Sequence, residues 1–326
     1  MQGARKEDPE LQDERIKIDI ALLGVPKAGT STLFDLLNRH RQIAGSSPKE
    51  TFFFLDKAQP LFNSMGSSYC FNGEPGLSKF YEGGIRGKLT LEGTTLNVYS
   101  ETARDYFKYS ENTKFLISLR NPVERIYSLF RYVRDHQCNL DGGVSFAEFV
   151  TLALQGKVYQ LEKRFRSRSA YYALTNALTQ SDYSIWLDKW SFAYDQDRIK
   201  IILFEEFNAD RQRVMEEVLN WLGIDKIETQ ELELTLASNK TRSVRIRWLH
   251  QLARKVDFYL PASLKPNFLK MVYEWIQSKS GNKLGTDRPS DILEAKRALW
   301  GHFEPEFSGL SKRYGLEVTK WWHPPS

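Results

Sequence analysis

IALLGVPKAGTSTL, residues 20–33, is the stretch that decides the fold of this 326-residue chain. The residues that lead into it alternate isoleucine, at positions 16, 18 and 20, with Lys17 and Asp19, and the run is wholly apolar from Ile20 to Leu23. This pattern predicts a strand that enters at Ile16 and becomes buried on both faces of a sheet. Gly24 interrupts the apolar run, and leucines at 33, 36 and 37 then follow helical spacing. The stretch therefore predicts a strand, a loop and a helix in that order.

The loop between this strand and this helix has the composition of a phosphate site. Backbone N–H groups at the start of a helix have no partners within it, and the aligned peptide dipoles place about half a positive charge there. A plain turn capped by a threonine is the simpler interpretation. The residues that we predict to bind phosphate are Lys27, Ala28, Gly29, Thr30, Ser31 and Thr32.

The position of the lysine indicates which kind of phosphate loop this is. The nucleoside-triphosphatase pattern GxxxxGK[ST] would place lysine at position 30, where this chain has Thr30. The lysine stands three residues earlier, as Lys27, inside the loop. This placement favours contact with one phosphate and its leaving oxygen over the reaction of a nucleoside triphosphate.

A second strand–helix unit follows at residues 115–128. Phe115–Leu119 is a short apolar run that predicts a strand. Asn121 can cap the following helix, Pro122 suits its first position, and Glu124 falls at the capping-box position.

Two side chains of this unit can grip a further phosphate. Arg120 leaves the predicted strand end, and Ser128 lies about two helical turns beyond the cap, on the same face of the helix. Arginine offers a planar fork of donors that matches a phosphate group. A surface arginine with a solvated serine is the alternative.

The third unit defines the fold class. The apolar run Ile199–Phe204 predicts a strand, and Arg211–Leu222 predicts an amphipathic helix that ends near Gly223. Strands that alternate with helices imply a parallel sheet covered on both faces. We predict a P-loop-like three-layer α/β fold with a central parallel sheet flanked by helices, as a single domain over residues 16–326 after a flexible arm at residues 1–15.

Composition excludes several classes of protein. Apolar residues make up 41% and charged residues 27%, the balance of a soluble globular protein. The net charge of +5 is spread along the chain and no nucleic-acid-binding motif is present, so we expect no nucleic-acid partner. No run approaches the roughly 18 apolar residues of a membrane helix, and the start of the chain lacks the apolar centre of a signal peptide, so we expect no membrane partner.

Cysteine and histidine usage points to a reducing compartment. Cys70 and Cys138 are the two cysteines of the chain, and no cysteine–histidine cluster has metal-ligand spacing. We therefore expect no metal site and a cytoplasmic location. A luminal domain separated from its membrane anchor would have the same composition, and the oligomeric state is not predicted by these features.

Several segments resemble the sulfotransferases that depend on 3′-phosphoadenosine 5′-phosphosulfate (PAPS). Pro26–Leu33 is similar to their loop for the 5′-phosphosulfate, and Arg120–Ser128 to their motif for the 3′-phosphate. Pro48–Asp56 is similar to the segment of the heparan-sulfate branch that carries a catalytic glutamate, here Glu50, and Leu310–Trp322 resembles the closing helix of that branch. The resemblance implies PAPS as co-substrate and 3′-phosphoadenosine 5′-phosphate (PAP) as product.

The chain departs from that branch at two places. The branch often has Glu-Lys-Ser/Thr-Pro where this chain reads Glu92-Gly93-Thr94-Thr95, so a lysine that shapes the acceptor side is missing. The loop Asn239–Arg245 loosely matches the basic loop over the 3′-phosphate. Within it we predict Lys240 and Arg245 as further ligands of the nucleotide.

The residues also predict a division of chemical roles. Glu50 can accept the proton of the acceptor group as general base, with a structural ion pair to Lys49 or Lys27 as the alternative role. His136, eight residues after Ser128, is the second candidate base. Lys27 and the loop amides would neutralise charge on the leaving 5′-phosphate oxygen.

The acceptor is the least determined part of the prediction. We expect a hydroxyl group, or an amine, of a small polar molecule such as a natural product. The basic run Lys163–Arg168 keeps a glycan acceptor open, because such a run can contact an anionic polysaccharide. A P-loop kinase acting on a small molecule and a catalytically inactive nucleotide-binding module are the remaining alternatives.

Overall fold

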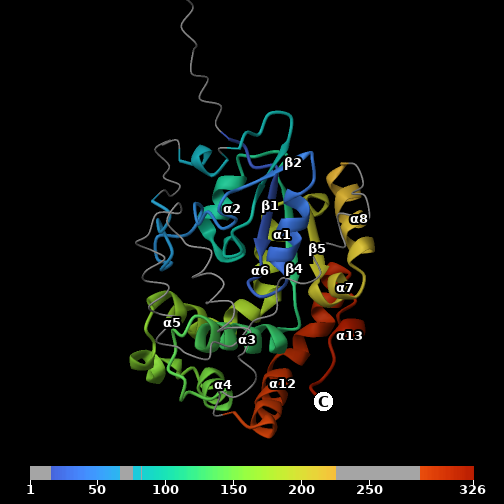
Figure 1. The fold of residues 1–326 in the computed structure, drawn as a ribbon. Helices are drawn as coiled ribbons and strands as arrows, with labels where there is room; N and C mark the ends of the chain where they lie inside the picture. The colour runs from blue at the N-terminus through green and yellow to red at the C-terminus, as the bar shows by residue number, and fades with distance from the viewer. Residues whose placement is uncertain (1–15, 67–75, 82, 225–286) are drawn as a thin grey trace, which may run out of the picture.

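The structure is a computed structural model that describes residues 16–66, 76–81, 83–224 and 287–326 (Figure 1). The predicted arm at residues 1–15, and Lys240 and Arg245, lie outside the described residues. The described strands form one parallel sheet in the order β2-β3-β1-β4-β5. The strands are β1 (Ile20–Gly24), β2 (Ile43–Gly45), β3 (Leu89–Glu92), β4 (Lys114–Leu119) and β5 (Ile199–Leu203).

Strand β1 lies at the centre of the sheet and is buried along its whole length. Its side chains alternate between the faces, because successive residues of a strand point to opposite sides. Ile20 and Leu22 pack in one cluster of buried residues, and Ala21 and Leu23 in another. The predicted strand is therefore confirmed, although it begins at Ile20 rather than at Ile16.

Helices cover both faces of the sheet (Figure 1). On the face of Ile20 and Leu22, the buried side chains come from α1 (Thr30–Asn38) and α8 (Arg211–Leu222). On the opposite face they come from several helices, among them α3 (Pro122–Arg131). The predicted three-layer α/β fold with a central parallel sheet is confirmed.

The other described helices are mostly short. The α-helices are α2 (Glu101–Phe107), α4 (Phe146–Leu154), α5 (Arg168–Thr175), α6 (Tyr183–Ala193), α7 (Phe204–Ala209), α12 (Pro289–Tyr314) and α13 (Val318–Trp321). Short 3-10 segments lie at Ser78–Phe80, Asn97–Tyr99, Val158–Arg164, Thr179–Ser181 and Gln196–Arg198, and a wide π-type turn lies at Tyr132–His136.

Helix α3 begins as predicted but without the expected capping box. The Asn121 side chain accepts a hydrogen bond from the Val123 N–H at 3.0 Å, and Pro122 occupies the first position. The Asn121 N–H donates to Glu205 at 2.9 Å, whereas Glu124 pairs with Lys296 of α12 at 2.5 Å. The capping-box prediction for Glu124 is wrong because a carboxylate from a distant helix takes the cap N–H.

The third unit differs from prediction at one residue. Strand β5 ends at Leu203, and Phe204 begins α7 instead of ending the strand. Helix α8 has the predicted bounds, with the Asp210 side chain accepting from the Arg213 N–H at 3.1 Å. Gly223 ends the helix at a φ of 77°, a left-handed conformation that glycine adopts without steric cost.

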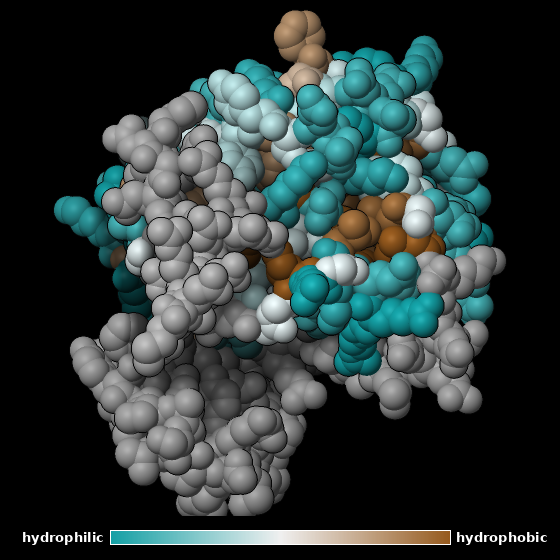
Figure 2. Space-filling view, turned by 90° about the horizontal axis from the view of Figure 1, so that it is seen from above, coloured by the Kyte–Doolittle hydropathy of each residue, from teal (hydrophilic) through white to brown (hydrophobic). Residues whose placement is uncertain are grey.

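The direction of the strands determines where ligands can bind. In Figure 1 the strands run from the upper edge of the sheet downward, toward α3. Figure 2 looks onto the upper end, whose described surface is mostly hydrophilic with one hydrophobic patch. The carboxyl ends of the strands meet at the other end, where open α/β folds place their ligands.

Candidate active site

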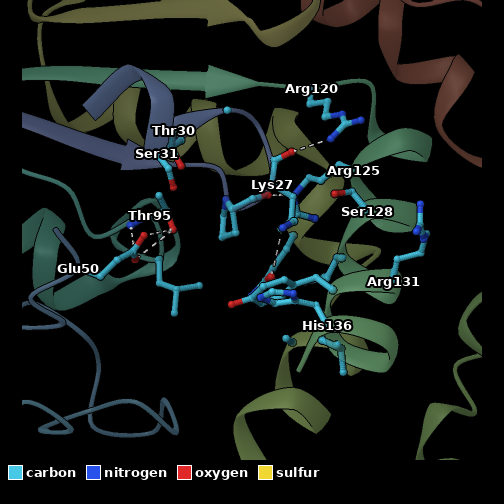
Figure 3. Close-up of a pocket in the computed structure, with 18 of the residues that line it drawn as sticks. Lys27, Thr30, Ser31, Glu50, Thr95, Arg120, Arg125, Ser128, Arg131 and His136 are labelled. Carbon is cyan, nitrogen blue, oxygen red and sulfur yellow. Dashed lines mark hydrogen bonds between the residues drawn. The ribbon is translucent and has the colours of Figure 1, made fainter. Parts of the chain in front are cut away.

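A cavity of about 1280 Å³ lies at the carboxyl ends of the strands. Its walls come from the loop after β1, the segment after β2, the loop after β3, helix α3, parts of α5 and α7, and the start of α8. Figure 3 shows labelled side chains from the loops after β1 and β3, from the segment after β2 and from α3 around one space. The predicted site residues that line the cavity are Lys27, Gly29, Thr30, Ser31, Thr32, Glu50, Arg120, Ser128 and His136.

Ala28 differs from the prediction, because it turns away from the cavity. Its side chain is buried, its N–H donates to the Val25 carbonyl at 3.3 Å, and its carbonyl accepts from the Ser118 hydroxyl at 2.7 Å. Gly29 follows with a φ of 75°, and a Cβ there would stand 2.6 Å from the Phe204 ring. Only glycine fits this turn, which opens the start of α1 to the cavity.

Lys27 carries its ammonium group into the cavity from a left-handed backbone conformation, with a φ of 72°. Its Nζ stands 4.1 Å from the centroid of the Tyr132 ring. Burial, and to a lesser extent the nearby Arg120 guanidinium, lowers the pKa of Lys27 to about 8. An anion in the cavity would relieve both effects, since it favours the charged form.

Arg120 and Ser128 line the same cavity as the loop, as the prediction required. Arg120 Nη1 donates to the Lys27 carbonyl at 3.1 Å, and its guanidinium lies 4.7 Å from the Phe204 ring centroid. Its Nε atom is buried and has no hydrogen-bond partner among the described residues. Arg120 therefore supports the loop and keeps a donor for a ligand.

Glu50 lies on the opposite side of the cavity from α3 (Figure 3). One carboxylate oxygen accepts from Lys49 Nζ at 2.8 Å, and the other accepts from the Thr95 N–H at 3.2 Å. The side chain is 31% exposed, so the carboxylate is held in place while its edge still faces the cavity. The ion pair that we considered as an alternative role is present, with Lys49 rather than Lys27.

The comparison with known proteins decides the family. The sequence profile of the sulfotransferase domain matches residues 17–270, most of the chain. This chain belongs to the sulfotransferase family. Human carbohydrate sulfotransferase 15 is 22% identical to it over 290 residues, covering 74% of this chain and 51% of the relative. The human bifunctional heparan sulfate N-deacetylase/N-sulfotransferase 1 is 22% identical over 221 residues, covering 63% of this chain and 22% of the relative.

A solved structure agrees with the fold of this sulfotransferase. The crystal structure of a sulfotransferase from Alicyclobacillus acidocaldarius matches it with a TM-score of 0.61 at 17% identity, covering 94% of this chain and 99% of that chain. The predicted family and fold are thus confirmed. The sulfotransferase described here spans about half the length of carbohydrate sulfotransferase 15, so the likeness in sequence concerns one part of that relative.

The Glu92–Thr95 segment, where this sulfotransferase departs from the heparan-sulfate branch, lies directly behind Glu50. A Cβ at Gly93 would stand 2.6 Å from the Phe34 ring and 2.8 Å from Lys49 Cγ. Glycine therefore makes room for the Lys49 side chain, whose Nζ also lies 3.5 Å from the Thr30 hydroxyl. Lys49, which enters from the segment after β2, therefore occupies the space beside Gly93.

Glu92 is fully buried under the same segment. Its carboxylate accepts from the Thr51 hydroxyl at 2.8 Å, the Thr94 N–H at 3.0 Å and the Asn97 amide at 2.8 Å. These bonds tie the segment after β2 to the loop after β3, and so hold Glu50 next to Thr95. Burial raises the pKa of Glu92 to about 7, although the hydrogen bonds act in the opposite direction.

This pKa predicts how stability depends on pH. Protonated Glu92 contributes stability that is present below its unfolded-state pKa of 4.5 and is lost as the pH rises to about 7. The neutral variant Glu92→Gln cannot show this loss. We compare the free energy of unfolding of the unmodified protein with that of Glu92→Gln, measured by urea denaturation at each pH. The difference in favour of the unmodified protein should shrink by about 2 kcal/mol between pH 5 and pH 8. An advantage that grows with pH would contradict the assignment.

His136 lies across the cavity from Glu50 (Figure 3). Its ring stacks on Tyr132 with centroids 5.3 Å apart and planes at 22°. Because Tyr132 also contacts the Lys27 ammonium group, His136 belongs to the lysine side of the cavity. The two candidate bases therefore occupy opposite walls.

Arg125 is a cavity residue that the sequence did not indicate. Its guanidinium is fully buried and donates to the Pro26 carbonyl at 3.1 Å, the Ser181 hydroxyl at 2.6 Å and the Tyr99 hydroxyl at 3.2 Å. It thus anchors the loop that carries Lys27. Its buried partners lie far away in the sequence, so no local pattern could have indicated it. Further cavity residues that the sequence analysis missed are Thr95, Tyr132, Phe204 and Arg211.

The expectations of no metal site and no membrane partner can be examined in the described residues only. Within residues 16–66, 76–81, 83–224 and 287–326, no three side chains of histidine, cysteine, aspartate or glutamate are grouped to hold a metal ion. Over the same ranges, no helix has both the length and the apolar character needed to cross a bilayer.

Proposed function

We propose that this protein transfers the sulfuryl group of PAPS to an acceptor hydroxyl, or amine, in a single catalytic domain over residues 16–326. One observation carries the proposal: Lys27, Arg120, Ser128 and Glu50 line one cavity. A phosphate loop, a second basic site and a carboxylate therefore share one space. This combination supports a group-transfer reaction of a nucleotide with two separate phosphate groups.

The cavity fits the charges of PAPS. The start of α1, with Thr30, Ser31 and the ammonium group of Lys27, would bind the 5′-phosphosulfate. Arg120 and Ser128 would bind the 3′-phosphate. The buried Arg120 Nε, which has no hydrogen-bond partner among the described residues, supports this because buried donors in native proteins are nearly always paired.

The chemistry needs a base on one side of the sulfur and a cation on the other. Glu50 would accept the proton of the acceptor group while the acceptor oxygen or nitrogen forms its bond to sulfur. The bond between sulfur and the 5′-phosphate oxygen breaks, and that oxygen keeps the electron pair. Lys27 would neutralise the resulting charge, which leaves on PAP. Figure 3 shows Glu50 and Lys27 on different sides of the cavity, which supports such an in-line arrangement.

For the acceptor, we propose a small polar molecule. Neutral side chains from the segments around Glu50 line the cavity, among them Phe52 and Leu96. The basic run at residues 163–168 is engaged elsewhere: Arg164 pairs with Asp141 at 3.4 Å, and Arg166 donates to the Cys138 carbonyl at 3.1 Å. These contacts favour a small acceptor over an anionic polysaccharide bound by that run.

A hydroxyl or amine of a glycan is the second candidate acceptor. It is favoured by the relatives named above, which are described as a carbohydrate sulfotransferase and a heparan sulfate N-sulfotransferase. If the acceptor is a small polar molecule, we propose that the protein acts in the cytoplasm. Fractionation of cells that produce the protein would test that location.

Mass spectrometry would test the function directly. Incubation of the protein with PAPS and a panel of alcohols, amines and neutral oligosaccharides should yield a product that has gained one sulfuryl group. Thermal shift should show stabilisation by PAP without any metal ion, and a smaller effect of ATP. Magnesium-dependent turnover of ATP would favour the kinase alternative, and binding of PAP without any product would favour the inactive module.

A further inference from the structure

Tyr132 lies between the ammonium group of Lys27 and the ring of His136. The Lys27 Nζ stands 4.1 Å from the Tyr132 ring centroid, well within the range in which an aromatic face attracts a cation. The His136 ring stacks on the Tyr132 ring at 5.3 Å. All three residues line the same cavity.

The backbone around Tyr132 is unusual for a helix. Tyr132–His136 forms a π-type turn at the end of α3, in which the Gln137 N–H donates to the Tyr132 carbonyl at 2.8 Å. Such wide turns occur mostly as single insertions in helices, frequently at functional sites. Here the turn begins about one helical turn beyond Ser128, and it presents the Tyr132 ring to Lys27.

The surroundings of Lys27 disfavour its charge. Burial and the Arg120 guanidinium lower its pKa to about 8. The buried Arg125 guanidinium of α3 donates to the carbonyl of Pro26, the residue before Lys27. On the opposite wall, the Glu50 carboxylate is paired with Lys49. The face of the Tyr132 ring thus opposes the effects of burial and of Arg120 on Lys27.

We propose that Tyr132 is a positioning residue for Lys27 and acts through the face of its ring. This inference rests on the proposed function, in which Lys27 neutralises the leaving phosphate oxygen. Arg120 Nη1 holds the backbone end of Lys27 through the carbonyl, at 3.1 Å, and Tyr132 holds the ammonium end. A cation over an aromatic ring is stabilised by a factor of roughly 2 to 30, enough to decide whether a lysine of this kind is charged near neutral pH.

Titration calorimetry with PAP would test the proposal through two substitutions of similar size. Tyr132→Phe keeps the ring face and should bind PAP within about 2-fold of the unmodified protein. Tyr132→Leu removes the ring and should weaken PAP binding about 5-fold at pH 8, where less of Lys27 would be charged. At pH 6, where Lys27 is charged in either protein, the loss should fall below about 2-fold.

The Lys27→Met background provides the matched control. If Tyr132 acts through Lys27, Tyr132→Leu should not weaken PAP binding further in that background. The other titratable and charged groups that line the cavity include Arg120, Arg125, Glu50 and His136. Histidine is the residue type among these that commonly changes its charge between about pH 5 and pH 8. The pH series is therefore repeated in His136→Asn, where the effect of Tyr132→Leu should persist.

Three outcomes would overturn the proposal. They are equal losses for Tyr132→Phe and Tyr132→Leu, a loss that does not change with pH, and a loss that persists in Lys27→Met. If the unmodified protein does not bind PAP at all, the proposed function fails instead. The two failures are therefore distinguishable in one set of titrations.

Discussion

Glu50→Gln should leave PAP binding nearly unchanged and reduce turnover by a factor of about 10² to 10⁴. Glutamine has the same shape but cannot accept a proton, so the acceptor group would stay protonated as it meets the sulfur. The Thr95 N–H, at 3.2 Å from the carboxylate, can still donate to the amide oxygen, which keeps the side chain in place. The rate of sulfated product formed per enzyme at saturating PAPS measures turnover, and calorimetry with PAP measures binding. Together they separate the two effects.

Glu124→Gln is the matched control for this prediction. Glu124 also lines the cavity and is also paired with a lysine, Lys296 at 2.5 Å, but it lies on α3, away from Glu50. It should lose far less turnover than Glu50→Gln. Near-normal turnover in Glu50→Gln together with a large loss in His136→Asn would assign the base to His136 instead.

The strand, loop and helix around Lys27 were predictable because the information for them is local. Strand β1, the glycine turn and helix α1 follow one another within 20 residues, and apolar spacing alone separates strand from helix. The unusual position of Lys27, two residues before Gly29 rather than directly after it, could likewise be seen in the sequence. Glu50 needed the resemblance to a known family, because a carboxylate between lysine and threonine has no local signature of a base.

The surroundings of the site could not be predicted, because they depend on residues far apart in the sequence. Lys49 fills a space that exists only because Gly93, in the loop after β3, has no side chain. The Asn121 N–H had a plausible local partner in Glu124, yet it binds Glu205 at 2.9 Å. Tertiary contacts thus overrode the local capping rule, and the wrong prediction arose at the point where α7 approaches α3.

Arg120→Ala should weaken binding of PAP by a factor of roughly 10 to 150, because a hydrogen bond to a charged group is worth about 1.5 to 3 kcal/mol. Binding of adenosine 5′-monophosphate, which lacks the 3′-phosphate, should weaken much less. A small loss is expected for both nucleotides, since Arg120 Nη1 also supports the Lys27 carbonyl at 3.1 Å. Calorimetry measures both affinities, and the prediction concerns the ratio of the loss for PAP to the loss for adenosine 5′-monophosphate.

The comparison of the two nucleotides distinguishes two roles of Arg120, which are binding of the 3′-phosphate and support of the loop that carries Lys27. If Arg120 only held the Lys27 carbonyl, both nucleotides would lose affinity equally, because the damaged loop would bind the 5′-phosphate of each. Arg164→Ala removes an arginine outside the cavity, one that pairs with Asp141, and should change neither affinity. A selective loss for PAP in Arg120→Ala alone would therefore place the 3′-phosphate at the end of β4, beside the buried Nε atom that has no partner among the described residues.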